Sequence, residues 1–231
     1  MMLGGSIQAV ALATLAFVGL HFLMSHPLRG PLVGLLGEKA FSGVYSLIVA
    51  LAFAWMVYAH ATAPYVAIWG DPVWAHHLLP LIMVPAVLLV VLGLTSRNPT
   101  LGPQGAGALA EVGYGVTAIT RHPMLWGFAL WAMGHMLANG DQATVILTAG
   151  ILVLALGGAL AIDAKKRRAL GAPYEAFMAR TSFVPFLAMG QGRARLQWRD
   201  IGWWRINLSV VVYAALVLLH KLVIGRPAIG G

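Results

Sequence analysis

The sequence ITRHPMLWGFALWAMGHMLANGD, residues 119–141, places charged residues, a long apolar run and an internal histidine in one stretch. At about 100° per residue, one stripe of a helix here would hold Met124, Phe128, Trp131 and His135. A histidine inside an apolar helix needs a polar partner, because an unpaired polar group in hydrocarbon costs several kcal/mol. That partner is either a neighbouring helix or a metal ion, which neutral imidazole commonly binds. The glycines that flank the stripe, Gly127 and Gly134, would let another helix or a flat ligand come close.

The composition of the whole chain assigns it to the membrane proteins. Of its 231 residues, 60% are hydrophobic and only 10% are charged. Soluble domains carry about 25% charged residues, so a soluble protein is excluded. The chain has no cysteine. Disulfides, thiolate metal ligands and cysteine nucleophiles are therefore excluded, and histidine remains as the strong neutral ligand.

Apolar runs along the chain predict an all-α, polytopic integral membrane bundle of about six spanning helices. A span needs about 20 apolar residues to cross the hydrocarbon core. We expect the spans at residues 6–24, 41–63, 78–94, 123–139, 143–162 and 206–224. We treat residues 1–231 as a single transmembrane domain, with residues 163–205 as its one sizeable non-spanning segment.

The positive charges predict the orientation of the bundle. All but two of the 15 Lys and Arg residues fall in the first, third and fifth connections between spans, the exceptions being Lys221 and Arg226. Cytoplasmic connections carry the excess of Lys and Arg, so both termini are expected on the outer side. The net charge of +8 then indicates contact with anionic lipid rather than with nucleic acid. The segment 163–205 should lie in the lipid headgroup layer, with its aromatic residues dipping inward.

Four of the eight histidines lie within or beside the predicted spans: His21, His60, His122 and His135. Ionisable residues at such positions are functional candidates by default. They are compatible with a histidine-ligated haem or with a substrate site at the cytoplasmic mouth. Tyr174 and Glu175 would add hydrogen-bonding groups at that mouth.

Several motifs resemble the NnrU family of bacterial integral membrane proteins, which are associated with denitrification and nitric oxide metabolism. They are HFLMSHPLRG, GEKAFSGVYSL, APYVAIW, the 119–141 stretch and residues 163–185. The family includes the plastid zeta-carotene isomerase, which uses haem b to isomerise a central cis double bond. The resemblance therefore implies a bacterial inner membrane protein with haem b as cofactor, and the orientation predicted from the charges would make its termini periplasmic.

By this resemblance, His21 and His135 would ligate the haem iron, and His122 also has a counterpart. We expect His135 and His122 to be catalytic, and Arg121, Phe128 and Trp131 to lie with the histidines against the cofactor. Two functions stay open: an isomerase of 15-cis-zeta-carotene, and a non-enzymatic redox or nitric oxide-responsive protein. Counting along the helices places His21 about 5 Å and His135 about 18 Å from the cytoplasmic end. A His21–His122 pair is therefore an alternative ligand set.

A second resemblance, to isoprenylcysteine and phospholipid methyltransferases, implies a third function. Those enzymes share an Arg-His-Pro motif, a later acid and a Gly-x-x-Tyr segment that ends in Phe-x-Pro. The matching positions are Arg121, His122, Pro123, Asp163, Gly171, Tyr174 and 183–185. The chain departs from the pattern at Ala164, where those enzymes have a second acid. This resemblance implies an S-adenosylmethionine site on the cytoplasmic side, with Glu175 as a further contact.

Overall fold

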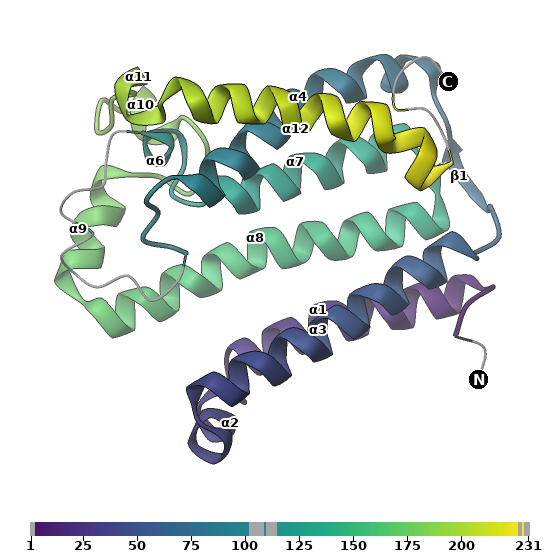
Figure 1. Cartoon of the computed structure of the whole chain (residues 1–231), viewed down its shortest axis with the longest axis horizontal. Helices are drawn as coiled ribbons and strands as arrows, with labels where there is room; N and C mark the ends of the chain where they lie inside the picture. The colour runs from purple at the N-terminus through teal and green to yellow at the C-terminus, as the bar shows by residue number, and fades with distance from the viewer. Residues whose placement is uncertain (1–2, 102–108, 110–114, 226–227, 229–231) are drawn as a thin grey trace. The chain divides into compact units, whose positions relative to one another are not determined.

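The computed structural model describes residues 3–101, 109, 115–225 and 228, so the predicted charge at Arg226 lies outside the described residues. The described chain is built from α-helices and a single short two-stranded ribbon (Figure 1). The predicted all-α membrane protein is confirmed. The chain divides into two compact units, residues 1–73 with 135–154, and residues 74–134 with 155–231. Helices α7 (Pro123–Ala138) and α8 (Gln142–Leu170) contribute to both units.

The first unit contains two long helices, a short two-stranded ribbon, the end of α7 and the first part of α8. Helix α1 (Ile7–Ser25) is followed by the short α2 (Arg29–Leu36) and by α3 (Glu38–Ala61). The Ser6 side chain accepts a hydrogen bond from the Ala9 amide at 3.1 Å, which caps α1. Strand β1 (Ala67–Gly70) pairs antiparallel with β2 (Gly140–Asp141). The ribbon ties the end of α3 to the start of α8.

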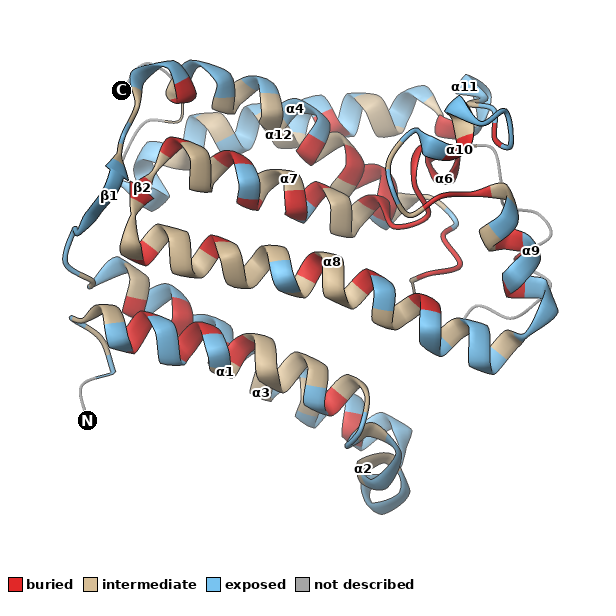
Figure 2. Ribbon diagram, turned by 180° about the vertical axis from the view of Figure 1, so that it is seen from behind, coloured by how far each residue is buried: buried red, intermediate tan, exposed pale blue. Residues whose placement is uncertain are grey.

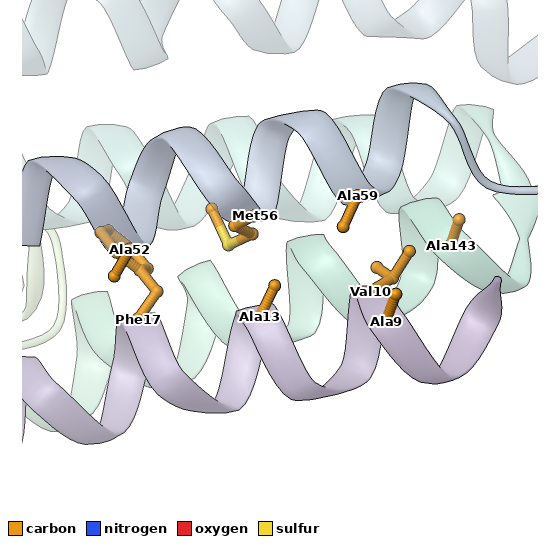
Figure 3. Close-up of a cluster of buried hydrophobic side chains, with 8 residues drawn as sticks. All are labelled: Ala9, Val10, Ala13, Phe17, Ala52, Met56, Ala59 and Ala143. Carbon is orange, nitrogen blue, oxygen red and sulfur yellow. The ribbon is translucent and has the colours of Figure 1, made fainter. Parts of the chain in front are cut away.

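Small side chains let α1, α3 and the first turns of α8 pack closely in this unit. The cluster of buried residues, drawn in Figure 3, comprises Ala9, Val10, Ala13, Phe17, Ala52, Met56, Ala59 and Ala143. Alanines bring helices near one another where lipid supplies no hydrophobic driving force between them. Ala143 packs with Ala9 and Val10, so α8 begins beside the start of α1.

The second unit surrounds the Arg-His-Pro segment. It contains most of α4 (Val73–Thr95), the short α6 (Val116–Ile119), the first part of α7 and the second part of α8. Three short helices then lie outside the long ones: α9 (Ala172–Arg180), α10 (Leu187–Gly190) and α11 (Trp198–Ile201). The unit ends with α12 (Trp203–Ile224).

Five described helices are long and apolar enough to cross a membrane: α1, α3, α4, α8 and α12. The predicted span at 123–139 is α7, whose 16 residues give a length of about 24 Å, short of a hydrocarbon core of about 30 Å. Helix α7 nevertheless meets α8 at its start and is joined to α8 by a short turn at its end. His122, just before α7, bonds Asp163 of α8, and Ala138 is separated from the start of α8 only by the β2 turn. Helices α7 and α8 therefore form an antiparallel hairpin.

The first residues of the segment 163–205 continue α8 through Leu170. Asp163 consequently lies on a helix. The break comes at Gly171, whose φ of 58° is in the left-handed region that glycine adopts readily. Pro173 follows in the first turn of α9, where a missing amide costs no helical hydrogen bond.

The apolar helix faces that are exposed in the structure are the faces that a bilayer would cover. Along α12 most residues are exposed (Figure 2), and Leu218 and Leu222 are 78% and 82% exposed. In water such apolar surface would be unfavourable, whereas in a bilayer it faces hydrocarbon. Buried residues in the same figure gather instead around the start of α7.

Candidate functional site

The carboxylate of Asp163 is the centre of a buried polar network in the second unit. Its Oδ2 accepts hydrogen bonds from Arg121 Nε at 2.8 Å and Nη2 at 2.7 Å. Its Oδ1 accepts from His122 Nε2 at 2.9 Å and from the Tyr174 hydroxyl at 2.7 Å. We call these four residues the Asp163 network. The chain thus brings together three segments: the Arg-His-Pro turn, α8 and α9.

Burial makes this network energetically sensitive. The side chains of Arg121, Asp163 and His122 are only 10%, 8% and 0% exposed, and Tyr174 is fully buried. Because the guanidinium and the carboxylate neutralise each other, the network carries no uncompensated charge as long as His122 is neutral. Removing one partner of a buried pair would leave the other charged and unpaired, which is strongly unfavourable.

The network also keeps Tyr174, which lies outside the membrane spans, in its protonated form. Burial and the hydrogen bond to Asp163 raise the pKa of the Tyr174 phenol. Ionised Tyr174 would lose its only donor and place a second negative charge beside the carboxylate. Tyr174 therefore remains a neutral hydrogen-bond donor under ordinary conditions.

Backbone pairing with the Phe183 segment holds the Arg-His-Pro turn in place. The Arg121 amide donates to the Ser182 carbonyl at 3.0 Å, and the Phe186 amide donates to the Ile119 carbonyl at 2.8 Å. The Phe183 carbonyl accepts from the Thr120 hydroxyl and from the Trp126 indole, at 2.7 and 2.8 Å. These bonds satisfy backbone groups between α6 and α7, where no helix could do so.

Of the predicted mouth residues, Tyr174 joins the network and Glu175 does not. Glu175 pairs with Arg167 at 2.9 Å, and both side chains are more than half exposed. A pair this exposed contributes little to stability. The methyltransferase-like sequence pattern indicated Arg121, His122, Asp163 and Tyr174 as individual positions. It did not show that the other three side chains meet at the carboxylate of Asp163.

The predicted haem ligand His21 lies in the first unit, in the last two turns of α1. Its Nδ1 is 3.0 Å from the Phe17 carbonyl. A carbonyl oxygen only accepts, so Nδ1 carries the proton and Nε2 keeps its lone pair, the tautomer of a metal-ligating histidine. The ring is held edge-on by Phe17 and Tyr45, at centroid distances of 4.6 and 6.0 Å. His21 thus fits the role of an axial ligand.

The other predicted ligand, His135, lies in the last turn of α7 and also belongs to the first unit. It is near the turn that leads to Ala143, which packs against Val10. His21 is eleven residues beyond Val10, or about 16 Å along α1. The two histidines are therefore at different levels along α1, and their pairing on one iron stays a prediction. His60 Nε2 bonds Thr144 Oγ1 at 3.0 Å, and His122 belongs to the other unit.

The residues of the predicted stripe on α7 differ in how far they are buried. Phe128 is 42% exposed, whereas Met124 and Trp131 are half-buried. A Cβ on Gly127 would come within 2.6 Å of the Ala86 carbonyl of α4. The close approach foreseen from the glycines is therefore made by a neighbouring helix.

Comparison with known proteins identifies the family. The sequence profile described as "NnrU protein" matches residues 9–228. The chain belongs to the NnrU family. Two relatives share part of its length, both named 15-cis-zeta-carotene isomerase, chloroplastic. The protein from Zea mays is 34% identical over 82 residues, which are 36% of this chain and 22% of the relative. The protein from Arabidopsis thaliana is 33% identical over 79 residues, 34% and 22% of the two chains.

The match to these relatives covers only about a fifth of their length. Their activity is therefore a guide to this member of the NnrU family and not a property transferred to it. No solved structure matches the chain.

Proposed function

We propose that this protein is a membrane isomerase that converts a cis double bond of an apolar polyene such as 15-cis-zeta-carotene. The observation that carries the proposal is the partial identity to two 15-cis-zeta-carotene isomerases within an NnrU match over most of the chain. The fold supports it, because a hydrocarbon substrate dissolves in the bilayer and reaches exposed apolar helix faces without crossing water. Phe128 of α7 presents such a side chain.

We further propose haem b as the cofactor, with His21 as an axial ligand and His135 as the predicted second ligand. The fixed tautomer of His21 and its half-buried, aromatic surroundings support the first assignment. A bound haem would supply an iron whose free coordination positions depend on its axial ligands and oxidation state. The residues of this chain would orient the imidazole and keep its Nε2 available.

The Asp163 network has a positioning role in this proposal. It connects the start of α7 with α8 and α9 through side chains that are almost fully buried. The network would therefore help to hold a site on α7 in place relative to α8. Arg121 and His122 would act in this way through Asp163, and their contact with a cofactor stays a prediction.

One observation favours a second candidate, a methyltransferase. Four of the residues that match the methyltransferase pattern converge on the Asp163 carboxylate, at the start of the basic segment 163–205. Their hydrogen bonds are, however, made to one another, and Glu175 turns to Arg167 instead. The isomerase is therefore the better-supported function. The redox or nitric oxide-responsive role stays a prediction from the sequence.

The test is expression in bacteria that accumulate 15-cis-zeta-carotene, followed by chromatographic separation of its isomers. The wild-type chain should deplete the 15-cis isomer, and His21→Ala should abolish this conversion. His77→Ala, at an exposed histidine, is the matched control and should retain it. Absence of conversion by wild-type protein that is present in the membrane and loaded with haem would refute the isomerase. Binding of S-adenosylmethionine by that protein would favour the methyltransferase.

The cofactor has its own readout. Protein purified in mild detergent should show a Soret band and a pyridine haemochrome, and both should be lost in His21→Ala. Colourless protein from haem-replete cells would refute the haem proposal. Loss of the band in His135→Ala as well would support the predicted pair, whereas its retention would assign the second position to another group.

A further inference from the structure

Two buried polar atoms beside the Asp163 network have no hydrogen-bond partner among the described residues. They are His122 Nδ1 and Asn98 Nδ2. The residues that carry them are 1% and 2% exposed. Buried polar groups in native proteins nearly always find a partner, which is protein, water or ligand. The two atoms therefore call for an occupant.

The surroundings of these atoms indicate how each would form a hydrogen bond. His122 Nε2 faces the Asp163 carboxylate, which only accepts, so Nε2 carries a proton, and in the neutral form of the ring Nδ1 is then an acceptor. Asn98 Oδ1 accepts from the Thr100 amide at 2.9 Å and from its hydroxyl at 2.8 Å. This identifies the oxygen of the amide group and leaves Nδ2 as the donor. The pair thus offers one acceptor and one donor.

Hydrogen bonds made by Thr100 place Asn98 next to the backbone of Arg121, the residue before His122. The Thr100 hydroxyl lies 2.8 Å from Asn98 Oδ1 and 3.2 Å from the Arg121 carbonyl. Because Arg121 and Asp163 already neutralise each other, the acceptor–donor pair itself offers no net charge to a ligand. A neutral group that both donates and accepts hydrogen bonds would complement it.

Apolar side chains lie beside the His122 ring. The Phe183 ring is edge-on to it at a centroid distance of 6.1 Å, and Trp126 is 5.8 Å from Phe183. Farther along the chain, Val184 and Phe186 are 47% and 60% exposed. A ligand that approached His122 past these residues should itself have an apolar body.

We propose that Asn98 and His122 bind the head group of a lipid-soluble quinol. One quinol hydroxyl would donate to His122 Nδ1, and an oxygen of the head group would accept from Asn98 Nδ2. The quinone form would keep the second bond and lose the first, so the quinol should bind more tightly. This site lies wholly in the second unit and is independent of the isomerase proposal. A hydrocarbon polyene could not satisfy either atom.

The test uses a photoreactive short-chain ubiquinol on the full-length protein in detergent, with the crosslinked peptides identified by mass spectrometry. Labelling should map to the Asn98 segment or to the His122–Trp126 segment. Excess unlabelled short-chain ubiquinol should suppress it. Asn98→Ala should weaken competition on the order of tenfold, the effect of one lost hydrogen bond. Asn207→Ala, at an exposed asparagine of α12, is the matched control and should behave as wild type.

Three results would overturn the proposal. Labelling that unlabelled quinol does not suppress would show partitioning into the detergent only. Suppressible labelling that maps to other segments would place the quinol elsewhere. Equal competition in Asn98→Ala and wild type would assign the two atoms to an internal water. If Asn98→Ala does not fold, the map and the competition on wild-type protein decide by themselves.

Discussion

Asp163 accepts hydrogen bonds from three side chains that are themselves buried. Asp163→Asn should therefore leave the Arg121 guanidinium without its counter-charge and lower the unfolding free energy by about 3–5 kcal/mol. Thermal unfolding in detergent measures this loss. Glu175→Gln breaks an exposed pair and is the control, with an expected cost of about 0–1 kcal/mol. Equal effects of the two substitutions would contradict the role given to the network.

Tyr174 provides a pH signature of the same network. Because its pKa is raised in the folded protein, folding holds the proton that the unfolded chain releases near pH 10. The contribution of Tyr174 to stability is complete below that pH and is lost as the pH rises above it. Wild-type stability should thus fall between about pH 9 and pH 11. Tyr174→Phe should be less stable at pH 7 and show a smaller fall, and an identical fall in both proteins would exclude this residue as the cause.

At the scale of single residues, the sequence indicated the participants but not the contacts. Arg121, His122, Asp163 and Tyr174 stood out through an intramembrane histidine and a family pattern. Their meeting depends on the course of α8 past Ile162 and on the turn at Gly171, which together bring Tyr174 back to Asp163. Asn98 and Thr100 gave no signal, because a polar residue in a connection normally indicates only solvent exposure.

At the scale of elements, the contact between α4 and α7 depends on glycine. Gly127→Val would bring a Cβ within 2.5 Å of a Val90 side-chain carbon and 2.6 Å of the Ala86 carbonyl. Such overpacking should cost about 1–3 kcal/mol and be visible in thermal unfolding. Gly158→Ala in α8, where an added Cβ meets nothing within 4 Å, should instead be neutral or slightly stabilising. A neutral Gly127→Val would contradict close packing of α7 on α4.

The positions of the long helices were predictable because a hydrocarbon core imposes a minimum apolar length. The predicted spans near α1, α3, α4 and α12 differ from the observed helices mainly at their ends. The sequence did not predict α2 or the β1–β2 ribbon. Both are short and depend on tertiary contacts: β1 pairs with β2 across the chain, and Arg29 at the start of α2 pairs with Glu38 of α3.

At the scale of the whole molecule, the charge distribution predicts which ends face the cytoplasm. The chain has no cysteine, so single introduced cysteines report their location without background. Arg168→Cys should resist a membrane-impermeant thiol reagent in intact cells and react after permeabilisation. His77→Cys, from the opposite set of connections, should react in intact cells. Reversed labelling of the two positions would overturn the predicted orientation.

We propose above that this member of the NnrU family isomerises a polyene within the bilayer. The most direct measurement adds 15-cis-zeta-carotene to purified, haem-loaded protein in liposomes and follows the isomers by chromatography. We predict time-dependent loss of the 15-cis isomer that is proportional to the amount of protein and absent with His21→Ala. An unchanged isomer ratio with folded, haem-loaded wild-type protein, under both oxidising and reducing conditions, would contradict it.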